Sequence, residues 1–207
     1  MLPFRLTPVY KDYLWGGTTL KTQFQKQTNL QRVAESWELS AHRDGDCILA
    51  DGERSGMPLS KFVQEYPQLL GPRYQGHAAF PILLKLIDSK KNLSVQVHPD
   101  DDYAKRVENG QGKTEMWVIL DCEPDAFLYF GFRNAVSTAE VRARLSDGTI
   151  TEVLQKVPVK KGDVFFIPAG TVHAIGAGIL VAEIQQNSNT TYRVYDYGRL
   201  DADGRPR

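Results

Sequence analysis

Short apolar segments that alternate with a period of two residues are the feature that most restricts how this chain can fold. Val, Ile, Phe and Tyr collect in segments of six to nine residues separated by turn residues, a pattern that favours strands over long helices. Eight such strands predict a mainly β fold, either a β-sandwich or a barrel. The segments are SWELSAH (36–42), FPILLKLID (80–88), LSVQVH (93–98), TEMWVIL (114–120), AFLYFGF (126–132), DVFFIPAG (163–170), ILVAEIQQ (179–186) and TYRVYDYG (191–198).

A few short helical insertions are expected to decorate these sheets. LSKFVQEYPQLLG spaces its apolar residues helically, and DDDYAKRVENG begins with acidic residues that a helix dipole favours and ends at Gly110. Ser137 and Glu140 form a capping-box pattern at the start of a third helix. We therefore expect one domain over residues 1–207 with three helical insertions. They should lie at about 55–72, 100–110 and 137–157.

Composition and charge exclude several classes of partner. The 207 residues are 42% hydrophobic, which is enough for a proper core. Lys plus Arg and Asp plus Glu balance at 25 each, and no basic run exceeds a pair, so neither nucleic acid nor a membrane surface is an expected partner. No segment has the length of a signal peptide or a membrane span, which predicts a cytoplasmic protein with free thiols at Cys47 and Cys122. The sequence leaves the oligomeric state open.

Polar side chains that could bind a metal lie at the ends or on the polar faces of three of the predicted strands. In LSVQVH, the alternation sends Leu93, Val95 and Val97 to one side and Ser94, Gln96 and His98 to the other. In GKTEMWVIL, the same alternation places Lys113, Glu115, Trp117 and Ile119 together. His173 begins a further strand after the Pro and Gly corner of GDVFFIPAGTVH.

These residues could have a structural role or a functional one. Taken singly, Lys113 and Glu115 would form a plain ion pair, and His173 would be a hydrogen-bonded structural residue. Taken together, Gln96, His98, Glu115 and His173 converge if the sheet curls into a barrel, and they offer two imidazoles, a carboxylate and an amide. This donor set suits one zinc ion per chain first, with iron, manganese or cobalt as alternatives. The amide is the weakest ligand of the four.

Two motifs add a resemblance to known proteins. GDVFFIPAGTVH, with Gly162, Pro168, Gly170 and His173 at the appropriate spacing, resembles the second motif of the cupin superfamily, which implies a cupin-type jelly-roll β-barrel. The first cupin motif is altered, since Gln96 occupies the place of its first His and Glu115 comes late.

A more specific resemblance covers nearly the whole chain. LSVQVHPDD, GKTEMW, PAGTVHAI and TYRVYDYGR, together with the early WGG and SWELSAH, resemble the short bacterial form of type I mannose-6-phosphate isomerases. The resemblance implies that Gln96, His98, Glu115 and His173 hold one zinc ion, that Arg193 is an active-site residue, and that Lys113 lies close to the substrate. Family members continue into a further small β-rich domain, whereas this sequence stops at Arg207.

The activity that the resemblance implies is the interconversion of mannose 6-phosphate and fructose 6-phosphate through an enediol. Such a reaction needs a base and stabilisation of an oxyanion. Arg193 is permanently protonated and fits the second task, Lys113 is a candidate proton carrier, and the base stays unassigned. Two other interpretations remain open: a non-haem iron cupin oxygenase, because two His and one carboxylate also hold iron, and a non-catalytic sugar-binding cupin.

Overall fold

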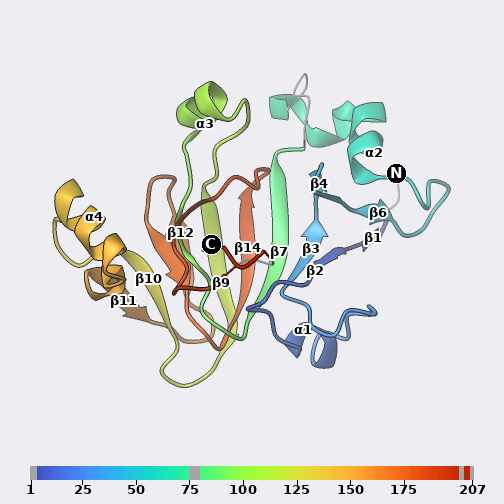
Figure 1. Cartoon of the computed structure of the whole chain (residues 1–207). Helices are drawn as coiled ribbons and strands as arrows, with labels where there is room; N and C mark the ends of the chain where they lie inside the picture. Colours follow the sequence, from blue (N-terminus) through green and yellow to red (C-terminus); the bar gives the residue numbers. More distant parts are fainter. Residues whose placement is uncertain (1–3, 75–79, 201–202, 206–207) are drawn as a thin grey trace.

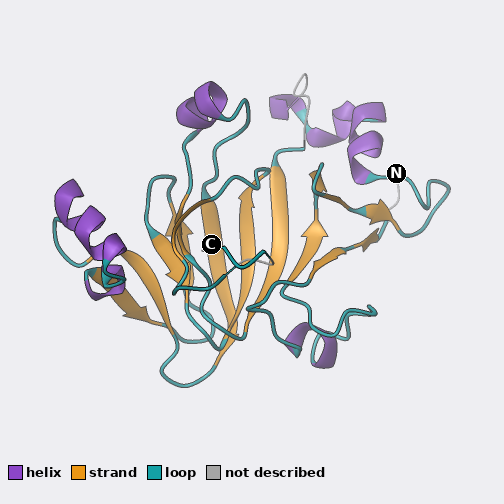
Figure 2. Cartoon of the chain, in the orientation of Figure 1, coloured by secondary structure: helices purple, strands orange, loops and turns teal. Residues whose placement is uncertain are grey.

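Two antiparallel sheets form the body of the protein (Figures 1 and 2). The computed structural model describes residues 4–74, 80–200 and 203–205. The six-stranded sheet has the order β12 (Val164–Ile167), β9 (Glu115–Cys122), β14 (Ile179–Gln186), β7 (Ile82–Ser89), β3 (Glu35–Leu39) and β2 (Val9–Lys11). The five-stranded sheet has the order β11 (Leu154–Pro158), β10 (Phe127–Phe132), β13 (His173–Ile175), β8 (Val95–Val97) and β15 (Tyr192–Tyr195). The predicted mainly β fold is confirmed.

Short paired strands and helices complete the fold. β1 (Leu6–Thr7) pairs with β6 (Ile48–Leu49), and β4 (Ala41–His42) pairs with β5 (Gly45–Asp46). The helical elements are α1 (Thr19–Thr22), α2 (Leu59–Glu65), η1 (Pro67–Leu70), η2 (Pro72–Tyr74), α3 (Asp101–Val107), α4 (Thr138–Ser146) and η3 (Ile150–Glu152). Figure 2 shows them at the periphery of the sheets.

The third predicted insertion is shorter than the sequence indicated. We expected helical structure over about 137–157, but α4 ends at Ser146, and residues 154–158 form the edge strand β11. Gly148 has a φ of 76°, a left-handed conformation that ends a helix and suits glycine. The start of α4 is as predicted, because the Ser137 hydroxyl accepts the backbone N–H of Glu140 at 3.1 Å.

The main core lies between the inner faces of the two sheets. β9 contributes Trp117 and Ile119, which are almost fully buried, while Met116 points outward. Lys113 and Glu115 are also buried, so the predicted alternation along this strand is confirmed. A buried charged pair thus stands at the start of β9, ahead of the apolar inner face of that strand.

The alternation predicted for LSVQVH holds for its polar residues, since Ser94 and Gln96 line the inner cavity and His98 joins the buried cluster, but it fails at Leu93. Val95 packs on the outer face of the five-stranded sheet, in a cluster with Tyr129 and Leu154, whereas Gln96 lines an inner cavity. Leu93 does not follow Val95, since it packs in the main core. The reason is that β8 begins at Val95, and the chain before it is not extended in the sheet.

Cys47 and Cys122 are free thiols, as predicted, with Cys47 buried. Among the described residues, no helix combines the length and the apolar character needed to cross a lipid bilayer.

Candidate active site

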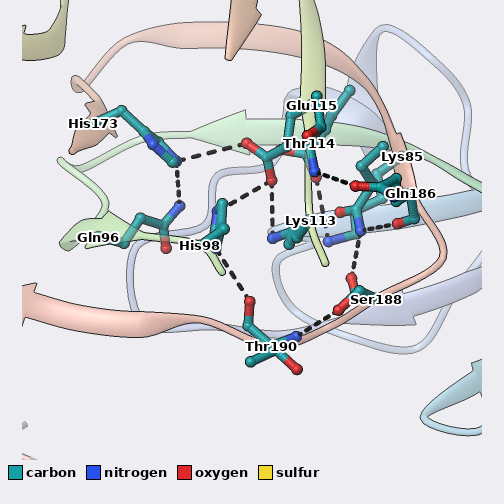
Figure 3. Close-up of polar contacts among 12 residues, drawn as sticks. Lys85, Gln96, His98, Lys113, Thr114, Glu115, His173, Gln186, Ser188 and Thr190 are labelled. Carbon is teal, nitrogen blue, oxygen red and sulfur yellow. Dashed lines mark hydrogen bonds and ion pairs between the residues drawn. The ribbon is translucent and has the colours of Figure 1, made fainter. Parts of the chain in front are cut away.

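Three of the four predicted metal ligands come together between the sheets (Figure 3). His98 follows β8, Glu115 opens β9 and His173 opens β13, and their exposures are 2%, 1% and 0%. His98 Nε2 lies 3.3 Å from Glu115 Oε1, and His173 Nε2 lies 3.6 Å from Glu115 Oε2. Both sheets therefore contribute to one buried cluster.

Backbone carbonyls fix the orientation of both imidazoles. His98 Nδ1 lies 3.1 Å from the Thr190 carbonyl oxygen, and His173 Nδ1 lies 2.8 Å from that of Thr171. Because a carbonyl only accepts, each Nδ1 carries the proton and each Nε2 presents a lone pair toward Glu115. Burial lowers the pKa of both rings, that of His98 to about 4 with Lys113 adding repulsion, so both are neutral at pH 7.

The carboxylate of Glu115 faces these lone pairs without a proton between them. Burial opposes its ionisation, but the ammonium of Lys113, 2.9 Å from Oε1, holds the pKa of Glu115 well below its usual range. Apart from this ion pair, His98 Nε2 and both Glu115 oxygens are buried and make no hydrogen bond in the described part of the chain. Electron-rich atoms that face one another in this way fit a divalent cation.

Gln96 lies at the edge of the same cluster. Its amide Nε2 is 3.4 Å from His173 Nε2, and its Cα is paired with that of His173 on one side and of Arg193 on the other. A half-turn of the terminal amide exchanges its nitrogen and oxygen, which would present Oε1 as a ligand. The sheet register thus sets His173, Gln96 and Arg193 in one row across three strands.

A cavity of about 300 Å³ lies beside the cluster. Gln96, Lys113 and Arg193 line it, so the structure brings the two residues predicted to be catalytic to the same opening as a predicted ligand. Trp15 adds an aromatic wall. Arg193 is exposed, so its guanidinium is accessible from solvent.

Three charged residues of the cavity escaped the sequence analysis. Glu35, Lys85 and Glu183 line it and are buried. Lys85 Nζ lies 3.3 Å from Glu183 Oε1 and 3.6 Å from Glu35 Oε2. A signal was present, because Lys85 and Glu183 stand between apolar residues at inward positions of β7 and β14, where the alternation of FPILLKLID and ILVAEIQQ calls for apolar side chains.

Electrostatics and two tryptophans hold this ion cluster together. Trp37 Nε1 donates to Glu35 at 2.7 Å, and Trp117 Nε1 donates to Glu183 at 2.9 Å. Burial by itself would lower the pKa of Lys85, but its two carboxylate neighbours outweigh burial and raise it. Burial, reinforced by repulsion from Glu115, raises the pKa of Glu183 even though Lys85 pulls it down.

The two-sheet architecture and the buried His, Glu and His cluster place the chain in the class of cupin-type jelly-roll proteins. The family described as phosphomannose isomerase type I, catalytic domain, matches residues 3–122, more than half of the sequence. The chain therefore belongs to the type I phosphomannose isomerase family.

Individual relatives agree with this assignment. Mannose-6-phosphate isomerase ManA of Bacillus subtilis is 45% identical over 206 residues, which cover 99% of this chain and 64% of ManA. Mannose-6-phosphate isomerase of Streptococcus mutans is 41% identical over 194 residues, which cover 94% of this chain and 60% of that protein. The crystal structure of the mannose 6-phosphate isomerase from Bacillus subtilis superposes with a TM-score of 0.92 at 41% identity, covering 99% of this chain and 65% of that one. This chain thus spans less than two thirds of the length of these relatives.

Proposed function

We propose that this chain provides the catalytic centre of a metal-dependent aldose–ketose isomerase that interconverts mannose 6-phosphate and fructose 6-phosphate. The observation that carries the proposal is the buried cluster of His98, Glu115 and His173 beside a cavity that Lys113 and Arg193 line. The relatives in the same family are named for mannose 6-phosphate, and moving a proton between C2 and C1 of that aldose gives the ketose fructose 6-phosphate. The cavity volume, about 300 Å³, is within the range of small-molecule sites.

The metal we assign to this site is Zn²⁺, with iron, manganese or cobalt as alternatives. His98, Glu115 and His173 would hold it, with Gln96 as a fourth and weaker ligand. When bound, such a cation supplies Lewis-acid stabilisation of the negative charge that develops on a sugar oxygen.

The remaining work falls to the side chains that line the cavity. Isomerisation moves a proton between C2 and C1 of the open-chain sugar and passes through an enediol. The guanidinium of Arg193 is a cation with five N–H donors and no acceptor, so its role is to stabilise the developing enediolate or to hold the phosphate, and it cannot be the base. Lys113 offers an ammonium in the same cavity, 2.9 Å from Glu115, and is our candidate for carrying a proton to or from a sugar oxygen.

A coupled assay tests the proposal most directly. Mannose 6-phosphate is supplied to the purified protein, and the formation of fructose 6-phosphate is followed with and without a metal chelator. We expect turnover that the chelator abolishes and that added Zn²⁺ restores. Activity that resists the chelator would remove the metal from the mechanism, and a failure of the metal-loaded protein to form fructose 6-phosphate would refute the isomerase assignment.

The composition of the ligand set also supports a second candidate function. Two His and one carboxylate also form the ligand set of non-haem iron oxygenases, and His98, Glu115 and His173 match that set. Metal analysis and an anaerobic assay separate the two functions. Isomerisation should proceed in the absence of dioxygen, whereas an oxygenase would show no turnover without it.

A further inference from the structure

Hydrogen bonds from every backbone N–H group hold the three-residue segment just before Glu115. Residues 112–114 carry Lys113 into the cavity and lead directly to Glu115 at the start of β9. Each of their three backbone N–H groups donates to a separate acceptor. The acceptors are Asp101 Oδ1 for Gly112 at 2.9 Å, the Pro99 carbonyl for Lys113 at 3.0 Å, and Gln186 Oε1 for Thr114 at 2.8 Å.

Two of these acceptors are side chains that also bind each other. Gln186 is the last residue of β14, and its Nε2 donates to both carboxylate oxygens of Asp101, each at 3.2 Å. The backbone N–H of Gln186 also donates to the Thr114 carbonyl at 3.1 Å. Gln186 therefore holds Thr114 by its backbone and its side chain at once, and it fixes the carboxylate that holds Gly112 (Figure 3 shows Gln186 beside Thr114).

Close packing makes this arrangement sensitive to small shifts. A Cβ added to Gly112 would lie 2.5 Å from the Asp101 backbone nitrogen and 2.6 Å from the Asp100 carbonyl carbon. The segment consequently rests directly on the first turn of α3 with no space in between. A change at the junction of Asp101 and Gln186 therefore acts on the segment directly, because Asp101 packs against Gly112 and both side chains hydrogen-bond to the segment's backbone.

We propose that Gln186 and Asp101 form a positioning pair that sets Lys113 and Glu115 in register with His98 and His173. The inference rests on the proposed function of that site. Neither residue of the pair belongs to the cluster or lines the cavity, so each acts through the backbone that it holds. Removing a residue that orients a metal ligand without itself binding the metal typically lowers metal affinity or activity by about 10- to 100-fold.

The test places a second carboxylate beside Asp101 and then removes the repulsion with a compensating substitution. Gln186→Glu keeps the side-chain shape and the acceptor for Thr114, but it sets two carboxylates against each other where Nε2 now lies 3.2 Å from Asp101. We expect turnover, Zn²⁺ affinity in a chelator competition, or both to fall about 10- to 100-fold. Adding Asp101→Asn supplies an amide donor to the new carboxylate, so the double variant should return to within about threefold of the wild type on the same scale.

Controls separate positioning from general damage. Gln155→Glu makes the same chemical change at an exposed position of β11, on the outer edge of the other sheet, and should leave turnover and Zn²⁺ affinity unchanged. Gln186→Met removes the side-chain hydrogen bonds to Thr114 and Asp101 without adding charge, so it should lose function in the same way and should not be rescued by Asp101→Asn. It also serves as the test variant if Gln186→Glu does not fold.

The outcomes distinguish this inference from the proposed function. Wild-type turnover and Zn²⁺ affinity in Gln186→Glu would overturn the positioning role, and a double variant no better than Gln186→Glu would overturn the pairing with Asp101. If the wild-type protein formed no fructose 6-phosphate, the proposed function would fall. The Zn²⁺ competition would still decide whether the pair positions Glu115.

Discussion

Replacing Lys85 with Met should expose how strongly the cavity depends on its ion cluster. Lys85 is 3% exposed and is the ammonium shared by the carboxylates of Glu183 and Glu35. The Met side chain fills much of the same volume but has no charge. Glu183 and Glu35 would then be left as two buried acids in the cavity without their cation.

The expected loss follows from this burial. Removing one member of a buried, hydrogen-bonded ion pair typically costs about 3 to 5 kcal/mol, because the remaining charge stays buried without compensation. In a chain of this size, each kcal/mol corresponds to about 2 to 4 °C in melting temperature, so Lys85→Met should melt about 6 to 20 °C below the wild type.

The pH dependence provides a second, independent readout. Burial already raises the pKa of Glu183 in the folded protein, and the loss of Lys85 removes the attraction that opposes this rise. A carboxyl with a folded pKa above its unfolded value contributes stability below the unfolded pKa, and this stability is lost as the pH rises through the folded pKa. The deficit of Lys85→Met relative to the wild type should therefore be smallest near pH 5 and grow toward pH 8.

Urea unfolding at several pH values measures the free energy of unfolding lost in Lys85→Met and the dependence of that loss on pH. Adding Glu183→Gln to Lys85→Met should recover part of the loss at pH 8, because it removes one of the two unpaired acids while an amide oxygen still accepts from Trp117. A deficit below about 1 kcal/mol at pH 8 would contradict the reasoning from buried-pair energetics. A deficit that does not change with pH would show that the carboxylates are not its source.

The proposed ligand and catalytic residues give two further predictions. Zn²⁺ at a hundred times its dissociation constant should stabilise the wild type by about 2.7 kcal/mol and His173→Ala hardly at all, as measured by calorimetric melting with and without the metal; equal stabilisation of both proteins would exclude His173 as a ligand. Arg193→Ala should lose nearly all turnover while metal analysis still finds close to one ion per chain, and wild-type turnover in this variant would exclude a catalytic role for Arg193.

Much of the fold could be predicted because most strands have one face in the core. The alternation of apolar and polar residues locates β7, β9 and β14 well, since their inward side chains are buried. It fails for β11, where Gln155 and Lys156 are exposed on an edge strand that has little apolar surface to signal it. The same lack of signal led to the overlong helical segment predicted up to residue 157.

The candidate site was predictable where chemistry and strand alternation coincide. His98, Glu115 and His173 are metal-binding residue types at the ends or on the polar faces of predicted strands, and the structure brings them together. The contacts of Asp101 and Gln186, 85 positions apart in the chain, depend on the register between α3 and β14, which no local pattern encodes. Lys85 was missed for a different reason, since its partners Glu35 and Glu183 lie on other strands and the pairing between strands is not visible in the local pattern.

The two sheets differ in how many residues pair between neighbouring strands. β7 and β14 are paired along eight residues, whereas β8 and β13 share a single pair, His173 with Gln96. Opening a short ladder breaks fewer hydrogen bonds than opening a long one, so we expect the five-stranded wall of the cavity to open locally more often than the six-stranded wall. A cation bound by residues of both sheets would tie the five-stranded wall to the six-stranded wall. Metal occupancy would then set how far the cavity opens and closes.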